Sequence, residues 1–249
     1  MKPEILSKLE SLGYKTFSGN YNLNLIGIRS AVQVPNKFKD RFLIIFEADG
    51  KWHEYEFPFT STPGSYYLKN PSRVSGTAVL CHDKQYRSCW KMGYHRGKYQ
   101  ALVQVNEMSV WRDNNKDEKA DYDGEVQTGL FGINCHRASE SRESESVDRW
   151  SAGCQVLANP SHFAVLMNLV NEQIKHGYGD TCSYILVHES SLNNKPKEEK
   201  SCPAKVLESQ SKSQEQSYQL SEKPLKKSTK PKKPRVKADP KSRKKSDSK

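Results

Sequence analysis

The sequence contains no long apolar run. Hydrophobic residues account for 35% of the 249 residues, and the mean hydropathy is −0.86. The longest apolar stretches, such as residues 42–46, have the length of a strand, whereas a membrane-spanning helix needs about 20 consecutive apolar residues. We therefore expect no membrane span. Lys2, Glu4 and Lys8 interrupt the segment in which a signal peptide needs an apolar core, so no export signal is visible.

Cysteine is also sparse. The six cysteines stand at positions 81, 89, 135, 154, 182 and 202, too widely spaced for a small disulfide-rich scaffold. No pair of Cys-x-x-Cys motifs is present, which removes a common zinc-ligand pattern. We expect that the protein requires no cofactor.

Net charge is absent from the first 190 residues. They contain 22 Lys and Arg against 22 Asp and Glu, whereas residues 191–249 contain 18 against 7, so the whole net charge of +11 lies in this last segment. Tyr218 is its only aromatic residue, and such a segment buries too little apolar surface to fold. We expect a disordered basic tail over residues 191–249. It could bind a polyanion, such as nucleic acid, anionic lipid or a wall polymer, or it could simply aid solubility.

The pattern of the remaining residues predicts a mainly β fold. Two helices are expected, over residues 3–12 and from Pro160, after the capping residue Asn159, to Gly177. The pair Asp49-Gly50 lies between two apolar runs and predicts a tight hairpin. We expect a β-sandwich or barrel at residues 23–190, with one or two peripheral helices and a lead-in at residues 1–22. The expected strands lie at residues 22–28, 41–47, 52–59, 77–80, 99–105, 108–111, 130–133 and 184–187.

One cysteine stands in a context that favours chemistry. Cys154 follows Ser151-Ala152-Gly153, a small and flexible segment in which a chain reversal could present the sulfur and leave backbone N–H groups for an oxyanion. His136 lies eighteen residues upstream, where a strand end could direct its imidazole at the thiol and help to form the thiolate. The alternative is that Cys154 is a buried apolar residue and His136 a structural one.

At these residues the sequence resembles the catalytic domain of the L,D-transpeptidase family. That family has a His, then 14 to 17 residues, then Ser/Thr-His-Gly-Cys, and here His136 is followed by 14 residues and Ser-Ala-Gly-Cys. Residues 62–66, Thr-Pro-Gly-Ser-Tyr, are similar to a second family segment with one residue missing. The likeness covers roughly residues 23–188. The sequence departs from the family pattern at Ala152, Gln155 and Val156, which bear on how a substrate is positioned.

The resemblance implies an L,D-transpeptidase-like β fold and a cysteine nucleophile that attacks peptidoglycan stem peptides, with the acyl group passed to an amine or to water. It implies Cys154 as nucleophile, His136 as general base and then acid, and Gly153 at the oxyanion hole. Ser151 and Arg137 are the expected substrate contacts. Cys135 could form a disulfide with Cys154 and silence it.

Two alternatives remain at this point. The same fold could serve as a non-catalytic module that binds the cell wall or a polyanion. Without an export signal we expect synthesis in the cytoplasm, and delivery to the wall would then need another route, for example on a phage particle.

Two further patterns have a functional and a plain interpretation. Residues 91–99 interleave basic and aromatic side chains, which could line a polymer-binding groove, but an exposed hairpin explains them as well. Four oxygen-bearing side chains occupy positions 1, 3, 5 and 9 of a loop, a spacing that can wrap a structural Ca²⁺. Glu118 stands where such loops need glycine, so an acidic surface loop is the alternative. The four are Asp113, Asn115, Asp117 and Asp121.

Overall fold

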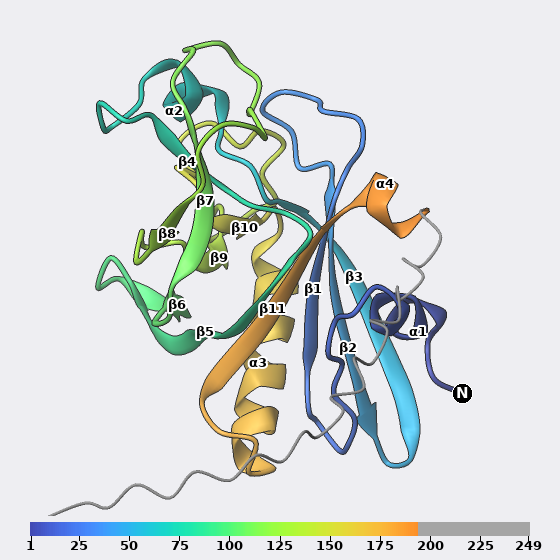
Figure 1. Ribbon diagram of the computed structural model, residues 1–249. Coiled ribbons are helices and arrows are strands. Elements are labelled where there is room, and N and C mark those ends of the chain that lie inside the picture. Colours follow the sequence, from blue (N-terminus) through green and yellow to red (C-terminus); the bar gives the residue numbers. More distant parts are fainter. Residues whose placement is uncertain (194–249) are drawn as a thin grey trace, which may run out of the picture. The chain divides into compact units, whose positions relative to one another are not determined.

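The computed structural model describes residues 1–193, which contain short strands and four helices (Figure 1). The predicted tail lies almost wholly outside the described residues. In chain order the elements are α1 (Glu4–Ser11), β1 (Asn24–Arg29), β2 (Asp40–Ala48), β3 (Lys51–Thr60), α2 (Ser65–Lys69), β4 (Thr77–Leu80), β5 (Lys84–His95), β6 (Tyr99–Gln104), β7 (Met108–Asp113), β8 (Gln127–Gly129), β9 (Cys135–Arg137), β10 (Gln155–Leu157), α3 (Pro160–Lys175), β11 (Thr181–His188) and α4 (Glu189–Leu192).

Eight strands close into a barrel in the order β1, β11, β5, β6, β9, β10, β3, β2. The pairs β1–β11 and β9–β10 are parallel, and the other barrel pairs are antiparallel. Strands β4, β7 and β8 form a separate antiparallel sheet. The expectation of a mainly β protein with few helices is confirmed. Among residues 1–193 no helix has the length and apolarity needed to cross a membrane.

Strand β2 shows why the barrel has two apolar faces. Phe42 and Ile44 point into the main core, whereas Leu43 and Ile45, on the other face, belong to a second cluster that includes Leu6 and Leu9 of α1. The other buried residues of this second cluster come from β1, β2 and β11, so α1, which Figure 1 draws at this side of the barrel, covers these strands. The segment expected as a lead-in is therefore packed onto the barrel.

Local signals placed several elements correctly. Asp49 and Gly50 both have positive φ, 51° and 73°, as a two-residue hairpin turn requires, and they join β2 to β3. Asn159 caps α3 with its side chain, which accepts a hydrogen bond from Ser161 N at 2.8 Å, and Pro160 begins the helix. These predictions are confirmed.

The strand expected at residues 130–133 is wrong. The backbone N–H groups of Phe131 and Ile133 donate to the side-chain oxygen of Gln104, at 3.0 and 2.9 Å, and Gly132 adopts a positive φ of 75°. One glutamine side chain thus replaces the neighbouring strand that this segment would need. The strands lie on either side of it, as β8 and β9.

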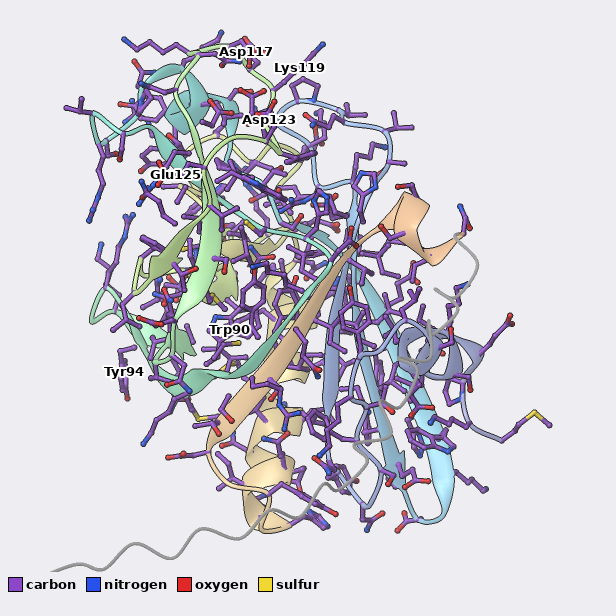
Figure 2. The ribbon with its side chains drawn as sticks, viewed as in Figure 1. Trp90, Tyr94, Asp117, Lys119, Asp123 and Glu125 are labelled. Atoms are coloured by element: carbon purple, nitrogen blue, oxygen red, sulfur yellow. The ribbon has the colours of Figure 1, made fainter. Side chains whose placement is uncertain are left out.

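Strand β5 was only partly anticipated. Its first half was missed, whereas the exposed hairpin expected at residues 91–99 is present as the β5–β6 turn, with positive φ at Arg96 and Gly97. Figure 2 shows Trp90 inside the fold and Tyr94 at its outside, in agreement with a fully buried Trp90 and a 62% exposed Tyr94.

Candidate functional site

Strands β9 and β10 bring the predicted nucleophile and base to one face of the barrel. Their parallel register pairs Gln155 with Cys135 and Val156 with His136, and Cys154 immediately precedes β10. Side chains alternate along a strand, so Val156 and His136 face one side and Cys135 and Gln155 face the other. We infer, by extending the alternation one residue before β10, that Cys154 faces the His136 side. Cys135 is indeed buried in the main core, and Gln155 accepts a hydrogen bond from the buried Tyr184 hydroxyl at 2.9 Å.

The disulfide considered between Cys135 and Cys154 is not formed. Cys135 and Cys154 are both free, as are Cys81, Cys89 and Cys182 among the described residues. Cys135 lies on the opposite face of its strand from the side that Cys154 faces, so their sulfurs point apart.

His136 is held in a defined tautomer. Its Nδ1 lies 2.8 Å from the carbonyl oxygen of Arg137 and 3.2 Å from the hydroxyl of Tyr99. A carbonyl oxygen only accepts hydrogen bonds, so Nδ1 carries the proton. The other nitrogen, Nε2, therefore bears a lone pair, and it is buried with no hydrogen-bond partner among residues 1–193. Such a nitrogen is a general base without a competing partner.

The electrostatics of the pair favour two neutral groups at rest. His136 is only 2% exposed, and burial, together with the neighbouring His95, lowers its pKa to about 3. Burial raises the pKa of the Cys154 thiol, although the Asn134 backbone and Arg96 act in the opposite direction. Both pKa shifts favour a protonated thiol and a neutral imidazole.

The Cys154 thiol forms no hydrogen bond with His136 within residues 1–193. Its Sγ donates to the carbonyl oxygen of Gly132 at 3.4 Å. Transfer of the thiol proton to Nε2 thus requires the sulfur to leave Gly132.

The turn before the cysteine is fixed by Ser151. This buried hydroxyl donates to the carbonyl of Cys154 at 2.8 Å and accepts from the N–H of Gly153 at 3.2 Å. Gly153 has φ of 125°, and an added Cβ would stand 2.6 Å from the carbonyl oxygen of Ala78, so only glycine fits. The Ser151 hydroxyl and the Gly153 N–H are therefore both used in hydrogen bonds within the turn. Within residues 1–193 the N–H of Cys154 is unpaired, which makes it the better oxyanion donor.

Asn36 and Gly64, both distant in the sequence, hold residues 148–151, which lead into this turn. The side-chain oxygen of Asn36 accepts from the N–H of Asp148 at 2.6 Å and from that of Ser65 at 3.3 Å, and its amide nitrogen contacts the Asp148 carboxylate. The N–H of Gly64 donates to the carbonyl of Ser151 at 2.9 Å. The family-like segment 62–66 therefore lies directly against the approach to Cys154.

A cavity of about 830 Å³ opens beside His136. Arg137, the expected substrate contact, lies in its wall with its guanidinium 4.2 Å from the centroid of Tyr99 and 3.5 Å from Glu140. Arg149 stacks 3.8 Å over Tyr66. Cys154 does not belong to the cavity lining, which is made of described residues. The charged lining residues are Arg96, Lys98, Arg137, Arg149, Glu140 and Asp148, so cations outnumber acids.

No family model, curated protein or solved structure matches this chain. Function is therefore inferred from the residues of the site themselves.

Sequence reasoning missed several residues of this site. His95 and Tyr99 contact His136, Asn134 contacts His95, and Asn36 braces the approach to Cys154. The basic and aromatic run at residues 91–99 was the available signal, because it supplies four of the cavity's side chains. Asn36 carried no local signal at all.

The predicted calcium loop begins at Asp113, the last residue of β7, and continues through the segment where Figure 2 shows Asp117 and Lys119. Its four residues are brought together: Asp113 Oδ2 accepts from Asp121 N at 3.0 Å, and the Asn115 amide nitrogen lies 3.2 Å from Asp117 Oδ2 and 3.0 Å from Asp121 Oδ2. Burial raises the pKa of Asp113 to about 6. In the described part of the chain no three His, Cys, Asp or Glu side chains are arranged to hold a metal ion. Calcium binding stays a prediction.

Proposed function

We propose that the protein is a cysteine-dependent acyltransferase or peptidase that acts on peptidoglycan stem peptides, with an L,D-transpeptidase-like barrel as its scaffold. One observation carries the proposal: a buried imidazole, on the strand that pairs with the one following Cys154, keeps Nε2 unprotonated and unpaired. A structural histidine would be expected to use both nitrogens.

In the proposed reaction the Cys154 proton passes to His136 Nε2 as the sulfur attacks the amide carbon. A C–S bond forms, and the carbonyl oxygen becomes an oxyanion that the Cys154 N–H stabilises. Collapse breaks the C–N bond, and the leaving amine takes the proton from His136. An amine or water then attacks the thioester, and the thiol is regenerated.

The charges of the cavity support a peptidic substrate with carboxylates. Arg96, Arg137 and Arg149 line it together with Lys98, against two acidic side chains. Stem peptides carry several free carboxylates, and guanidinium groups bind carboxylates with two parallel hydrogen bonds. Arg137 and Arg149 are already oriented by the aromatic rings beneath them.

A non-catalytic binding module is the second candidate. The observation in its favour is that the thiol, whose pKa is raised by burial, donates to Gly132 and lies outside the lining of the cavity. In this alternative the cationic cavity binds wall peptides without turnover.

Turnover of muropeptide fragments, followed by mass spectrometry, separates the two candidates. We expect cleaved or exchanged products with the wild-type protein, and none with Cys154→Ala or His136→Ala. His176→Ala serves as the matched control for the histidine, since it removes the same side chain at the C-terminal end of α3, away from the site. Unchanged turnover in Cys154→Ala would refute the proposed enzyme, and binding without any turnover in the wild type would favour the module.

A further inference from the structure

A second imidazole packs on His136. His95 ends β5, and its ring lies against the His136 ring with centroids 4.0 Å apart and planes 27° from parallel. It reaches this position because the β5–β6 hairpin pairs His95 with Tyr99, whose hydroxyl also contacts His136. His95 of β5 and Tyr99 of β6 thus both contact His136 of β9.

The hydrogen bonds of Asn134 fix the tautomer of His95. The side-chain oxygen of Asn134 accepts from the backbone N–H of Gln104 at 2.9 Å, which leaves its amide nitrogen facing His95 Nδ1 at 3.2 Å. An amide nitrogen only donates, so His95 Nδ1 accepts and the proton stays on Nε2. The two stacked rings therefore hold opposite tautomers. The Arg137 carbonyl sets that of His136, and the Gln104 N–H, through Asn134, sets that of His95.

The surroundings keep both rings neutral. The charged and titratable groups around the pair are Arg96 from the hairpin turn, Tyr99 from β6, and Arg137 beside His136. Burial, and then Arg96, lower the pKa of His95. A positive charge on either ring would face the other imidazole and an arginine in a partly desolvated site.

We propose that His95 is the positioning residue of His136: its ring covers one face of the base and prevents the ring flip about Cβ–Cγ that would exchange Nδ1 with Cδ2 and Nε2 with Cε1. After such a flip, Cδ2 would lie against the Arg137 carbonyl, the Nδ1 proton would lose this acceptor, and the Nε2 lone pair would point in another direction. The role in turnover rests on the proposed function, whereas the tautomers and the packing do not.

Nitrogen NMR of histidine-labelled full-length protein tests the tautomers directly. We expect His136 as Nδ1–H and His95 as Nε2–H at pH 7, with His95→Phe and His136→Gln used to assign the signals. In His95→Ala we expect His136 to average between its two tautomers, because the ring can then flip away from the Arg137 carbonyl that fixes the proton on Nδ1. A reversed tautomer at His136, or an unchanged single tautomer in His95→Ala, would overturn the proposal even if the protein turned over no substrate.

Turnover supplies the second readout. His95→Phe keeps a flat ring, so we expect its kcat to stay within about 3-fold of the wild type, whereas His95→Ala should lose about 10- to 100-fold in kcat with little change in KM. His176→Ala, which removes another stacked histidine far from β9, should have no effect. Equal kcat in His95→Ala and the wild type contradicts the role, and a thermal unfolding curve shows that each variant is folded.

Discussion

Replacing Gly64 with alanine tests how closely the approach to Cys154 is packed. The φ of Gly64 is −75°, which any residue adopts, so backbone strain is not at issue. The difficulty is space: an added Cβ would stand 2.1 Å from the carbonyl oxygen of Asp148 and 2.8 Å from its N and C atoms. Normal contact needs about 3.5 Å, so one of the two backbones has to move by roughly 1.4 Å.

The expected cost follows from this displacement. Overpacking costs about 1–3 kcal/mol, and the lower entropy of the unfolded alanine chain returns about 0.4–1 kcal/mol, so we expect a net destabilisation of about 1–2 kcal/mol. The movement would disturb the hydrogen bonds that Asp148 N–H donates to Asn36 and that Gly64 N–H donates to Ser151. Because Ser151 holds the Cys154 turn, kcat should fall by about 100-fold.

Urea unfolding and muropeptide turnover measure the two effects. Gly129→Ala is the matched control, because its added Cβ would meet only the Phe131 ring at an ordinary 3.6 Å. We expect its stability to lie within about 0.5 kcal/mol of the wild type. If Gly64→Ala is as stable and as active as Gly129→Ala, the segment at residues 62–66 does not support the site.

Four further predictions concern charge and ligands. His136 is neutral above pH about 3, and burial keeps the Cys154 thiol protonated past its ordinary pKa, so we expect kcat/KM to be constant from pH 5 to 8. A fall in kcat/KM below a pKa near 6 would contradict the neutral pair. In a Cys202→Ala background, iodoacetamide should alkylate Cys154 more slowly after Arg96→Ala, which removes a cation that lowers the thiol pKa, than after the control Arg73→Ala. Millimolar Ca²⁺ should raise the Tm of the wild type but not of Asp117→Asn, and equal Tm values with and without Ca²⁺ would withdraw the calcium prediction. Truncation after residue 193 should abolish salt-sensitive polyanion binding and leave turnover intact, and persistent binding would place the contact elsewhere.

The predictable part of the fold is the part set by neighbours in the chain. The Asp49-Gly50 hairpin and the capped start of α3 depend on residues within a few positions of one another, and both were predicted correctly. The strand expected at residues 130–133 failed because Gln104, about thirty residues away, takes its backbone N–H groups. No local pattern contains that information.

Strand β5 was hidden for a different reason. Ser88 has a positive φ of 45°, and the register with β11 shifts between Cys182 and Tyr184. A bulge of this kind breaks the alternation of buried and exposed side chains, which is the signal that sequence reasoning uses for a strand. Trp90 and Cys89 are consecutive and both fully buried.

The same division applies to the candidate site. The spacing of His136 and Cys154 is local enough to be noticed in a sequence, but the protonation of His136 is decided by partners that the barrel brings in. Tyr99 of β6 contacts the Nδ1 of His136, and His95 of β5 covers one face of its ring. The motif therefore identifies which residues to test, and the closed barrel determines whether they can react.

The separation of the thiol from the base has a consequence for the proposed reaction. Without substrate, Cys154 Sγ donates to the Gly132 carbonyl, and His136 Nε2 has no hydrogen-bond partner among residues 1–193. Neither group is therefore activated. A substrate carbonyl that binds the free N–H of Cys154 would lie next to Sγ, and the movement of Sγ toward the carbonyl carbon is also a movement away from Gly132. In the proposed enzyme, proton transfer to His136 is thus coupled to substrate binding, and the thiol stays protonated and poorly reactive until a substrate arrives.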